Sequence, residues 1–385
     1  MAVYLDHNAT TPLDPAVLAA MLPYLQSRYG NPSSVHGPGR EARAAIDEAR
    51  EQVAALVGAH PSQVIFTSGG TEANNLAIKG IANACDPGGN HELAISAVEH
   101  ASVIAPARAL ERNGWRLRTI AVDADGRVPP ERFAAALGPS TRLVSVMAAN
   151  NETGVVQDIG TLAETARTHG AWMHTDATQA AGKTALDFEA SGVQMMTLSA
   201  HKLYGPKGIG ALIVDKRLDL APLLEGGGHE AGRRSGTENV AAIVGFGTAA
   251  ERARAGLVER QAHMSALRLR LEECLREIAG VELVAADAPR LCNTVCFSVR
   301  GIDGEAMLMQ LDRRGFAVSS GSACDSGTAA PSHVLLAMGI AEEVARCALR
   351  ASLGKDSTLA EVEEFAAALA AEVRTLRGLS LRATA

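Results

Sequence analysis

The chain has 385 residues, of which 47% are hydrophobic and 21% are charged, a composition typical of a globular protein with a large core. Its 36 Lys and Arg residues against 43 Asp and Glu residues give a formal net charge of −7, which argues against nucleic acid or an anionic membrane surface as the main partner. No apolar stretch approaches the ~18 residues of a membrane span. Residues 1–6 lack the basic and apolar parts of a signal peptide, so we expect a cytoplasmic protein.

Helix and strand patterns alternate from about residue 40 to residue 250. Apolar residues recur at helical spacing over 40–57 and 71–84. Short apolar runs bounded by polar or glycine residues predict strands at 64–67, 93–96, 143–148, 171–175, 195–199 and 210–214. This alternation predicts an α/β fold with a mostly parallel central sheet and helices on both of its faces. Ligands bind such sheets at the carboxyl ends of the strands.

The pattern changes after about residue 251. A long charged helix is predicted at 257–278, a strand at 292–299 and an apolar helix at 306–313, followed by a loop rich in serine and glycine at 319–328. Strands and helices in this order predict a second, smaller α+β domain. Its packing against the first domain would create a cleft.

Two charged residues follow predicted strands. Lys202 comes after 195–199 and precedes a glycine-rich loop, where a partly desolvated amine can act as a nucleophile and form a Schiff base. The alternative is a surface lysine in a turn. Asp176 ends the strand at 171–175 and could hold a pyridine nitrogen protonated, with Gln179 near the same ring. The alternative is an aspartate that caps the following helix.

A strand–loop–helix junction at 67–75 is a candidate anion site. Its paired glycines, including Gly70, leave backbone N–H groups free beside the helix dipole, and Thr71 adds a hydroxyl, an arrangement suited to a phosphate. The segment has neither a Walker motif nor a G-x-G-x-x-G fingerprint, so it fits nucleotide binding poorly. A plain capped helix start remains the alternative.

Three further polar residues are candidates with an ordinary structural alternative each. His100 follows a strand and could stack on a planar cofactor, although a lone histidine is more often a structural residue. Asn151 could reach a ligand or simply form a turn. Arg350 lies in a small apolar segment, where a buried guanidinium needs a carboxylate. That carboxylate comes either from an amino-acid substrate, bound bidentately, or from an internal salt bridge.

The chain has six scattered cysteines, which we expect to be free thiols in a reducing compartment. Cys324 differs from the others because it lies among small, flexible residues, where a thiolate would be accessible. The others lie in apolar contexts and are interpreted as small core residues. Cys292 and Cys296 share one face of the predicted strand, but no further Cys/His set completes a zinc site, so we predict no metal.

Taken together and in this order, these motifs resemble the cysteine desulfurases of the NifS/IscS type, in the class V aminotransferase group of fold-type I pyridoxal-phosphate (PLP) enzymes. One departure is His229, which stands where this family often has glutamine. The resemblance implies a large domain at 15–258 and a small domain formed by 1–14 and 259–385. The segments that carry it are 4–6, 9–12, 30–34, 66–75, 99–100, 150–157, 174–179, 198–210, 233–239, 319–324, 331–335 and 350–354.

The resemblance also implies a role for each site residue. Lys202 binds PLP covalently, Asp176 pairs with its ring nitrogen, Gln179 approaches the ring hydroxyl and His100 stacks on the ring. Asn151 and Arg350 position the carboxylate of the substrate. The phosphate is held by Gly70, Thr71, Ser199 and His201, joined by Thr237 from the partner subunit of a homodimer.

The implied reaction converts L-cysteine to L-alanine and leaves the sulfur as a persulfide on Cys324, for transfer to an acceptor protein such as an iron–sulfur scaffold. Thiolation of tRNA, nitrogenase maturation and DNA sulfur modification are equally open destinations. Three alternative functions remain: a PLP-dependent lyase acting on selenocysteine or cystine, a cofactor-free scaffold protein, and a nicotinamide-binding enzyme, which the missing glycine fingerprint disfavours.

Overall fold

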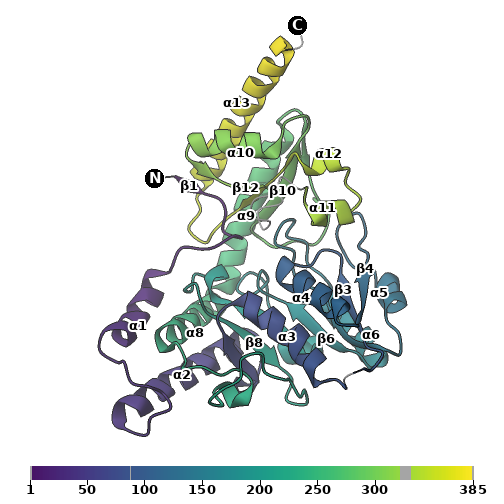
Figure 1. Ribbon diagram of the computed structural model, residues 1–385. Coiled ribbons are helices and arrows are strands. Elements are labelled where there is room, and N and C mark those ends of the chain that lie inside the picture. The colour runs from purple at the N-terminus through teal and green to yellow at the C-terminus, as the bar shows by residue number, and fades with distance from the viewer. Residues whose placement is uncertain (1, 87, 321–330, 384–385) are drawn as a thin grey trace.

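A computed structural model describes residues 2–86, 88–320 and 331–383 (Figure 1). Cys324 therefore lies outside the described residues. None of the helices in the described part of the chain combines the length and the apolar character needed to span a bilayer.

The larger sheet has seven strands in the order β2-β8-β7-β6-β5-β3-β4. β8 is antiparallel to both of its neighbours, and the other pairs are parallel, as the sequence predicts. The strands are β2 (Val64–Thr67), β3 (Glu92–Ser96), β4 (Arg116–Ile120), β5 (Thr141–Ser145), β6 (Trp172–Asp176), β7 (Met195–Ser199) and β8 (Gly210–Val214).

Two strands differ from the sequence prediction. β5 begins and ends earlier than the predicted run at 143–148, since the last apolar residues of that run belong to the loop that leads to the candidate site. β4 was not predicted because it alternates arginines with other residues at the edge of the sheet. Arg118 Nε lies 2.7 Å from a carboxylate oxygen of Glu92 on the neighbouring β3, which explains how a basic strand pairs there.

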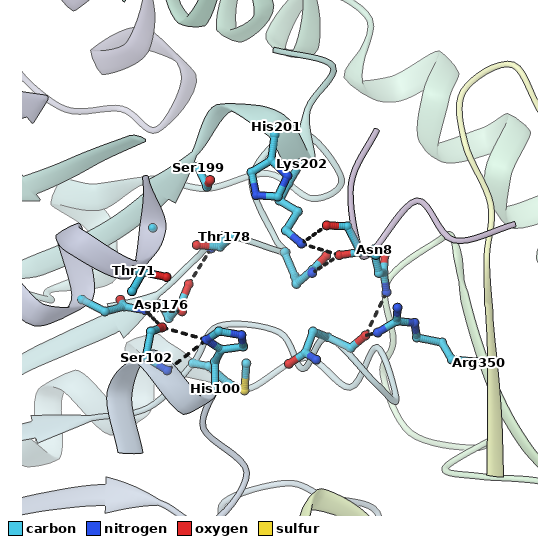
Figure 2. Close-up of a pocket in the computed structure, with 16 residues that line it drawn as sticks. Asn8, Thr71, His100, Ser102, Asp176, Thr178, Ser199, His201, Lys202 and Arg350 are labelled. Carbon is cyan, nitrogen blue, oxygen red and sulfur yellow. Dashed lines mark hydrogen bonds between the residues drawn. The ribbon is translucent and has the colours of Figure 1, made fainter. Parts of the chain in front are cut away.

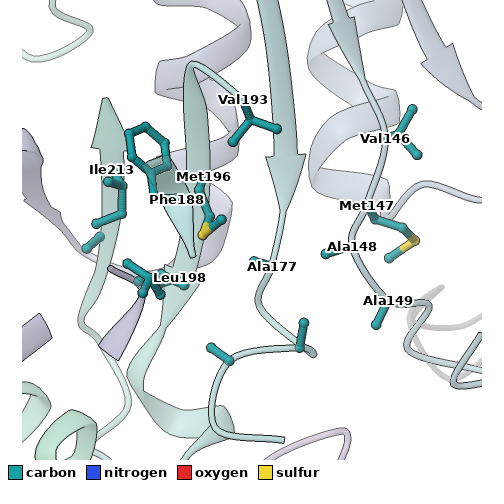
Figure 3. Close-up of a cluster of buried hydrophobic side chains, with 14 of the residues drawn as sticks. Val146, Met147, Ala148, Ala149, Ala177, Phe188, Val193, Met196, Leu198 and Ile213 are labelled. Carbon is teal, nitrogen blue, oxygen red and sulfur yellow. The ribbon is translucent and has the colours of Figure 1, made fainter. Parts of the chain in front are cut away.

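Helices cover both faces of this sheet (Figure 1). Ala211 and Ile213 of β8 belong to a core shared with α2, α6 and α8, whereas Leu212 and Val214 pack with α3 and α4 on the opposite face. Figure 3 shows part of the first core, where Ile213 lies near Met196 and Phe188. The helices around this sheet are α1 (Pro15–Gln26), α2 (Gly37–Leu56), α3 (Gly70–Ala84), α4 (Ala101–Arg112), α5 (Pro130–Ala136), α6 (Ile159–Thr168), α7 (Phe188–Ser191) and α8 (Val240–Ala255).

A second, antiparallel sheet has the strand order β12-β13-β10-β9, and its core is shared with α9, α10 and α13. A short parallel pair, β1 and β11, brings the N-terminal segment beside it (Figure 1). The strands are β1 (Val3–Tyr4), β9 (Val281–Leu283), β10 (Thr294–Val299), β11 (Phe316–Ala317), β12 (Ser319–Ser320) and β13 (Ala348–Ser352). The helices are α9 (Leu257–Arg276), α10 (Gly304–Arg313), α11 (His333–Ala337), α12 (Glu342–Ala345) and α13 (Leu359–Ala383).

The strand predicted at 292–299 starts two residues late, at Thr294. Cys292 lies before the strand, so the expectation that it shares a strand face with Cys296 is wrong. Its thiol instead faces the carbonyl oxygen of Lys183 at 3.7 Å. The α+β character of this part of the chain is as predicted, and the domain limits at 14/15 and 258/259 stay a prediction.

Candidate active site

A cavity of about 340 Å³ lies at the carboxyl ends of β6 and β7 (Figure 2). Most of the residues singled out in the sequence line it. Thr237 is exposed and does not line the cavity of this single chain. Its contribution from a partner subunit stays a prediction. The predicted residues on the wall are Gly70, Thr71, His100, Asn151, Asp176, Gln179, Ser199, His201, Lys202 and Arg350.

Asp176 is the last residue of β6 and is 5% exposed. Its Oδ2 accepts a hydrogen bond of 2.7 Å from Asn74 Nδ2, and its Oδ1 accepts one of 2.9 Å from the backbone N–H of Thr178. The second bond is a local turn contact, but residues 178–183 form turns and the next helix, α7, begins only at Phe188, so the capping alternative is wrong. The first comes from α3, so the carboxylate is fixed from two sides at the cavity wall.

Lys202 ends a short 3₁₀ turn, Ala200–Lys202, that follows β7. Its Nζ donates to the carbonyl oxygens of Asn8 at 2.5 Å and Ala9 at 2.7 Å. Figure 2 shows the side chain reaching across to the N-terminal segment. These two carbonyl groups hold the amine inside the site.

The two histidines of the site are both neutral near pH 7. Burial lowers the pKa of His100, which caps α4 by accepting the backbone N–H of Ser102 at 3.1 Å. Burial, followed by the positive charge of Lys202, lowers the pKa of His201 to about 4. Neutral imidazole rings present a flat surface and a hydrogen bond without adding charge to the cavity.

The start of α3 forms a cradle for an anion. A Cβ on Gly70 would lie 3.2 Å from Thr178 Oγ1 and 3.5 Å from Ser199 Cβ, so glycine keeps this space open. The hydroxyl of Thr178 is buried and has no partner among the described residues. Backbone N–H groups at a helix start and an unsatisfied hydroxyl together suit a phosphate group.

Arg350 lies on β13 with its side chain 3% exposed. Its Nη2 bonds Asp6 Oδ1 at 2.6 Å, and its Nη1 donates to the carbonyl oxygen of Asn151 at 2.9 Å. The internal salt bridge that the sequence left open is therefore present. The Nε–H of Arg350 has no acceptor in the described residues, so the guanidinium keeps one donor unsatisfied beside the cavity.

Sequence reasoning missed Asn8, which is 1% exposed and joins both sheets. Its Nδ2 donates to Asn151 O at 3.1 Å and to Thr294 Oγ1 at 2.9 Å, and its backbone N–H donates to Ser352 Oγ at 2.9 Å. A single asparagine in an N-terminal segment carries no local signal of such contacts, because its partners lie far along the chain. The other unpredicted residues on the cavity wall are Ala9, Asn74, Ser102, Met147 and Thr178.

Sequence reasoning also gave no role to Glu99, the residue before His100. Its side chain is fully buried, and burial raises its pKa to about 8. Its Oε1 accepts hydrogen bonds from Ser96 Oγ at 2.5 Å and from the backbone N–H of Met147 at 2.7 Å, while Oε2 has no partner among the described residues. Burial therefore favours the neutral form of this carboxyl group, which supports the loop that carries Met147 into the cavity.

A group with a raised pKa in the folded state stabilises the fold most below its unfolded pKa and loses that contribution as pH rises through its folded pKa. Between about pH 5 and pH 8, we expect the free energy of unfolding of the wild type to fall relative to that of Glu99→Gln. The expected change in this difference is on the order of a few kcal/mol. Denaturant titrations of both proteins at several pH values measure this. Parallel pH profiles for the two proteins would contradict the prediction.

An aminotransferase class V family model matches residues 3–365 of the chain. The chain belongs to this family.

Relatives within the class V aminotransferase family match the whole length of the chain. The cysteine desulfurase of Bradyrhizobium diazoefficiens is 45% identical over 383 residues, which cover 99% of this chain and 97% of that protein. The cysteine desulfurase IscS of Dictyoglomus turgidum is 42% identical and covers 98% of this chain and 96% of that protein.

Two solved structures extend the comparison. A NifS-like protein superposes with a TM-score of 0.91 at 35% identity, covering 97% of this chain and all of that one (100%). SspA, solved in complex with cysteine, gives a TM-score of 0.82 at 34% identity, covering 92% of this chain and 100% of that one. Both likenesses agree with the predicted PLP-dependent transferase fold of type I.

Membership of the class V aminotransferase family implies PLP as the cofactor, and the cavity fits it. Lys202 supplies an amine, Asp176 a carboxylate held in place, and His100 a neutral ring. The cradle at the start of α3 offers the unpartnered Thr178 hydroxyl to a phosphate. Amine, carboxylate and anion cradle are the groups that an aldehyde-bearing pyridine phosphate requires.

Proposed function

We propose that this protein is a PLP-dependent cysteine desulfurase, which converts L-cysteine to L-alanine and receives the sulfur on Cys324. One observation carries the proposal. The amine of Lys202, the carboxylate of Asp176 and the guanidinium of Arg350 line one cavity in a chain that is 45% identical to a cysteine desulfurase over 99% of its length.

When bound, PLP supplies an electron sink that makes the Cα proton of an amino acid acidic. Lys202 would hold the cofactor covalently, and its amine, when free, would accept that proton. Asp176 would keep the ring nitrogen protonated, and its two hydrogen bonds fix the carboxylate for this. His100 would stack on the ring, and Gln179 would approach the ring hydroxyl. Gly70, Thr71, Ser199 and His201 would hold the phosphate, with Thr237 of a second subunit.

Arg350 and Asn151 orient the carboxylate of L-cysteine. Arg350 keeps its bond to Asp6 and has the Nε–H to offer a second carboxylate. The backbone carbonyl of Asn151 accepts from Arg350, and Asn151 lines the cavity, where its side-chain amide can face the substrate. A charge-assisted hydrogen bond to the substrate carboxylate favours amino acids over simple thiols.

The Cys324 thiolate attacks the sulfur of the bound substrate, the substrate C–S bond breaks, and Cys324 keeps the sulfur as a persulfide. The described residues on either side of this segment support the assignment. Ser319 of β12 pairs with Arg350 of β13, and His333 Nε2 lies 3.0 Å from the carbonyl oxygen of Glu99. One flank therefore pairs with Arg350 of the cavity wall, and the other contacts Glu99, the residue before His100 of that wall.

The same proposal includes the wider setting: a homodimer in the cytoplasm that passes sulfur to an acceptor protein, such as an iron–sulfur scaffold. The test of the activity is direct. The protein loaded with PLP is incubated with L-cysteine and a thiol reductant, and alanine and sulfide are measured. Equal amounts of the two products support the proposal. Pyruvate and ammonia, or no product, would overturn it.

Replacing Asp176 by asparagine removes the charge opposite the ring nitrogen but keeps the size of the side chain. We expect turnover to fall about 10²-fold, because a hydrogen bond to a charged group contributes up to ~3 kcal/mol. Steady-state rates of alanine formation measure this effect. The exposed Asp125→Asn serves as the matched control and should keep the wild-type rate. An Asp176→Asn enzyme with more than about half of the wild-type rate would contradict the role.

A further inference from the structure

A buried lysine lies directly behind the wall of the active site. Lys183 is 6% exposed, and its Nζ donates to Gln179 Oε1 at 2.8 Å and to Asn8 Oδ1 at 3.3 Å. Neither partner is charged, and no salt bridge in the described part of the chain includes Lys183. An ammonium group buried against two neutral amides is costly, so its place calls for an explanation.

Because an ammonium group can only donate hydrogen bonds, its partners must turn an oxygen toward Lys183. Gln179 directs Oε1 at Lys183, which leaves Nε2 to donate to the backbone carbonyl of Asn8 at 2.9 Å. Asn8 Oδ1 accepts from Lys183 and also from Asn293 Nδ2 at 3.0 Å, which leaves Asn8 Nδ2 for Asn151 and Thr294. Lys183 thus sets the orientation of the Gln179 amide and, together with Asn293, that of the Asn8 amide.

The same contacts lead to Lys202. The carbonyl oxygen of Asn8 that accepts Gln179 Nε2 also accepts Lys202 Nζ at 2.5 Å. Asn8 therefore contacts two lysines, because its side chain accepts from Lys183 and its backbone carbonyl accepts from Lys202. Figure 2 shows the contact with Lys202.

We propose that Lys183 is a positioning residue for Lys202: it orients the Gln179 and Asn8 amides that border the cofactor and places a second positive charge behind the reactive amine. This inference rests on the proposed function, because it assigns Lys202 to the cofactor. Lys183 itself touches neither the cavity nor the substrate.

The electrostatic surroundings of Lys183 are almost wholly basic or neutral. Burial, followed by the charge of Lys202, lowers the pKa of Lys183 to about 7, and Arg350 acts in the same direction. Among the described groups that act on Lys183, only the Cys292 thiol opposes this shift, and Lys183 in turn lowers the pKa of His7 and of His201. The charge on Lys183 is therefore sensitive to pH near neutrality, and in its charged form Lys183 disfavours protonation of Lys202.

The experiment compares the PLP-loaded wild type with Lys183→Met, and with the exposed Lys216→Met as the matched control. The visible absorption band is titrated from pH 5 to pH 10. Loss of the neighbouring positive charge should move the midpoint to higher pH by at least about 0.5 unit, and Lys216→Met should leave it unchanged. A folded Lys183→Met enzyme whose midpoint stays within about 0.2 unit of wild type overturns the inference.

A second measurement needs no cofactor. Since the pKa of Lys183 is lowered in the folded state, the unfolded chain binds more protons between about pH 7 and pH 10, and stability rises with pH over this window. The melting temperature of cofactor-free wild type should therefore rise relative to Lys183→Met from pH 7 to pH 10, and parallel profiles overturn the inference. If Lys183→Met does not fold, Lys183→Gln takes its place in both measurements. A wild type without any visible band overturns the proposed function and this inference together, whereas a normal band with an unchanged midpoint overturns the inference alone.

Discussion

Replacing Lys202 by alanine is expected to reduce alanine formation from L-cysteine by more than ~10⁴-fold, because one side chain supplies both the covalent hold on the cofactor and the base that removes the Cα proton. The nearby amine of Lys183 is poorly placed to take over these two roles. Lys202 Nζ is held by Asn8 and Ala9 in the cavity, and the nearby Lys183 amine is engaged by Gln179 behind the wall.

Two readouts distinguish loss of chemistry from loss of structure. The visible band that lysine-bound PLP produces should disappear in Lys202→Ala, while the melting temperature of the cofactor-free protein stays close to wild type. Lys207→Ala, in the same loop but exposed, should keep both the band and the rate. A Lys202→Ala enzyme that retains one-hundredth of the wild-type rate or more would show that another group can act as the base.

Cys324→Ala should separate the binding of L-cysteine at the cofactor from the cleavage of its C–S bond. We expect the loaded variant to keep its visible band and its spectral change on addition of L-cysteine, but to form sulfide only at the background of the assay. The reason is that the thiolate is the nucleophile that breaks the C–S bond, and no other described thiol is placed to replace it. Cys292, Cys296 and Cys347 are buried, and burial raises the pKa of Cys296 to about 12.

Cys85→Ala is the matched control, since this thiol is partly exposed and lies at the end of α3, away from the cavity wall. It should release sulfide at the wild-type rate. Full activity of Cys324→Ala on L-cysteine would instead favour the lyase alternative, in which the substrate C–S bond breaks without a protein nucleophile.

The sheet and its helices were predictable because each element carries a local periodic signal. Short apolar runs locate β2, β6, β7 and β8 to within a residue, and the change in pattern after about residue 251 marks the second sheet. β4 was not predicted because Arg118 on this strand pairs with Glu92 on another strand. Local pattern describes burial, and it cannot describe a basic edge strand that is neutralised across the sheet.

The candidate site divides in the same way. Lys202, Asp176 and the start of α3 follow strands, and a parallel sheet brings such positions together, so position along the chain suffices to find them. Asn8, Lys183 and Glu99 act through bonds that neighbouring sequence does not reveal. Asn8 meets Asn293, for example, across 285 residues. For Arg350, the sequence established that a carboxylate was needed, and only the structure identified Asp6 as its partner.

The position of the N-terminal segment has a consequence for how the protein is made. Leu5 and Asn8 leave the ribosome long before Ser352, yet both bond to it. Contacts at such sequence separation form late and slowly. The nascent chain can build the larger sheet during translation, but its cofactor site is completed only after Ser352 has emerged. A substitution at Leu5 or Asn8 therefore acts on the last step of maturation.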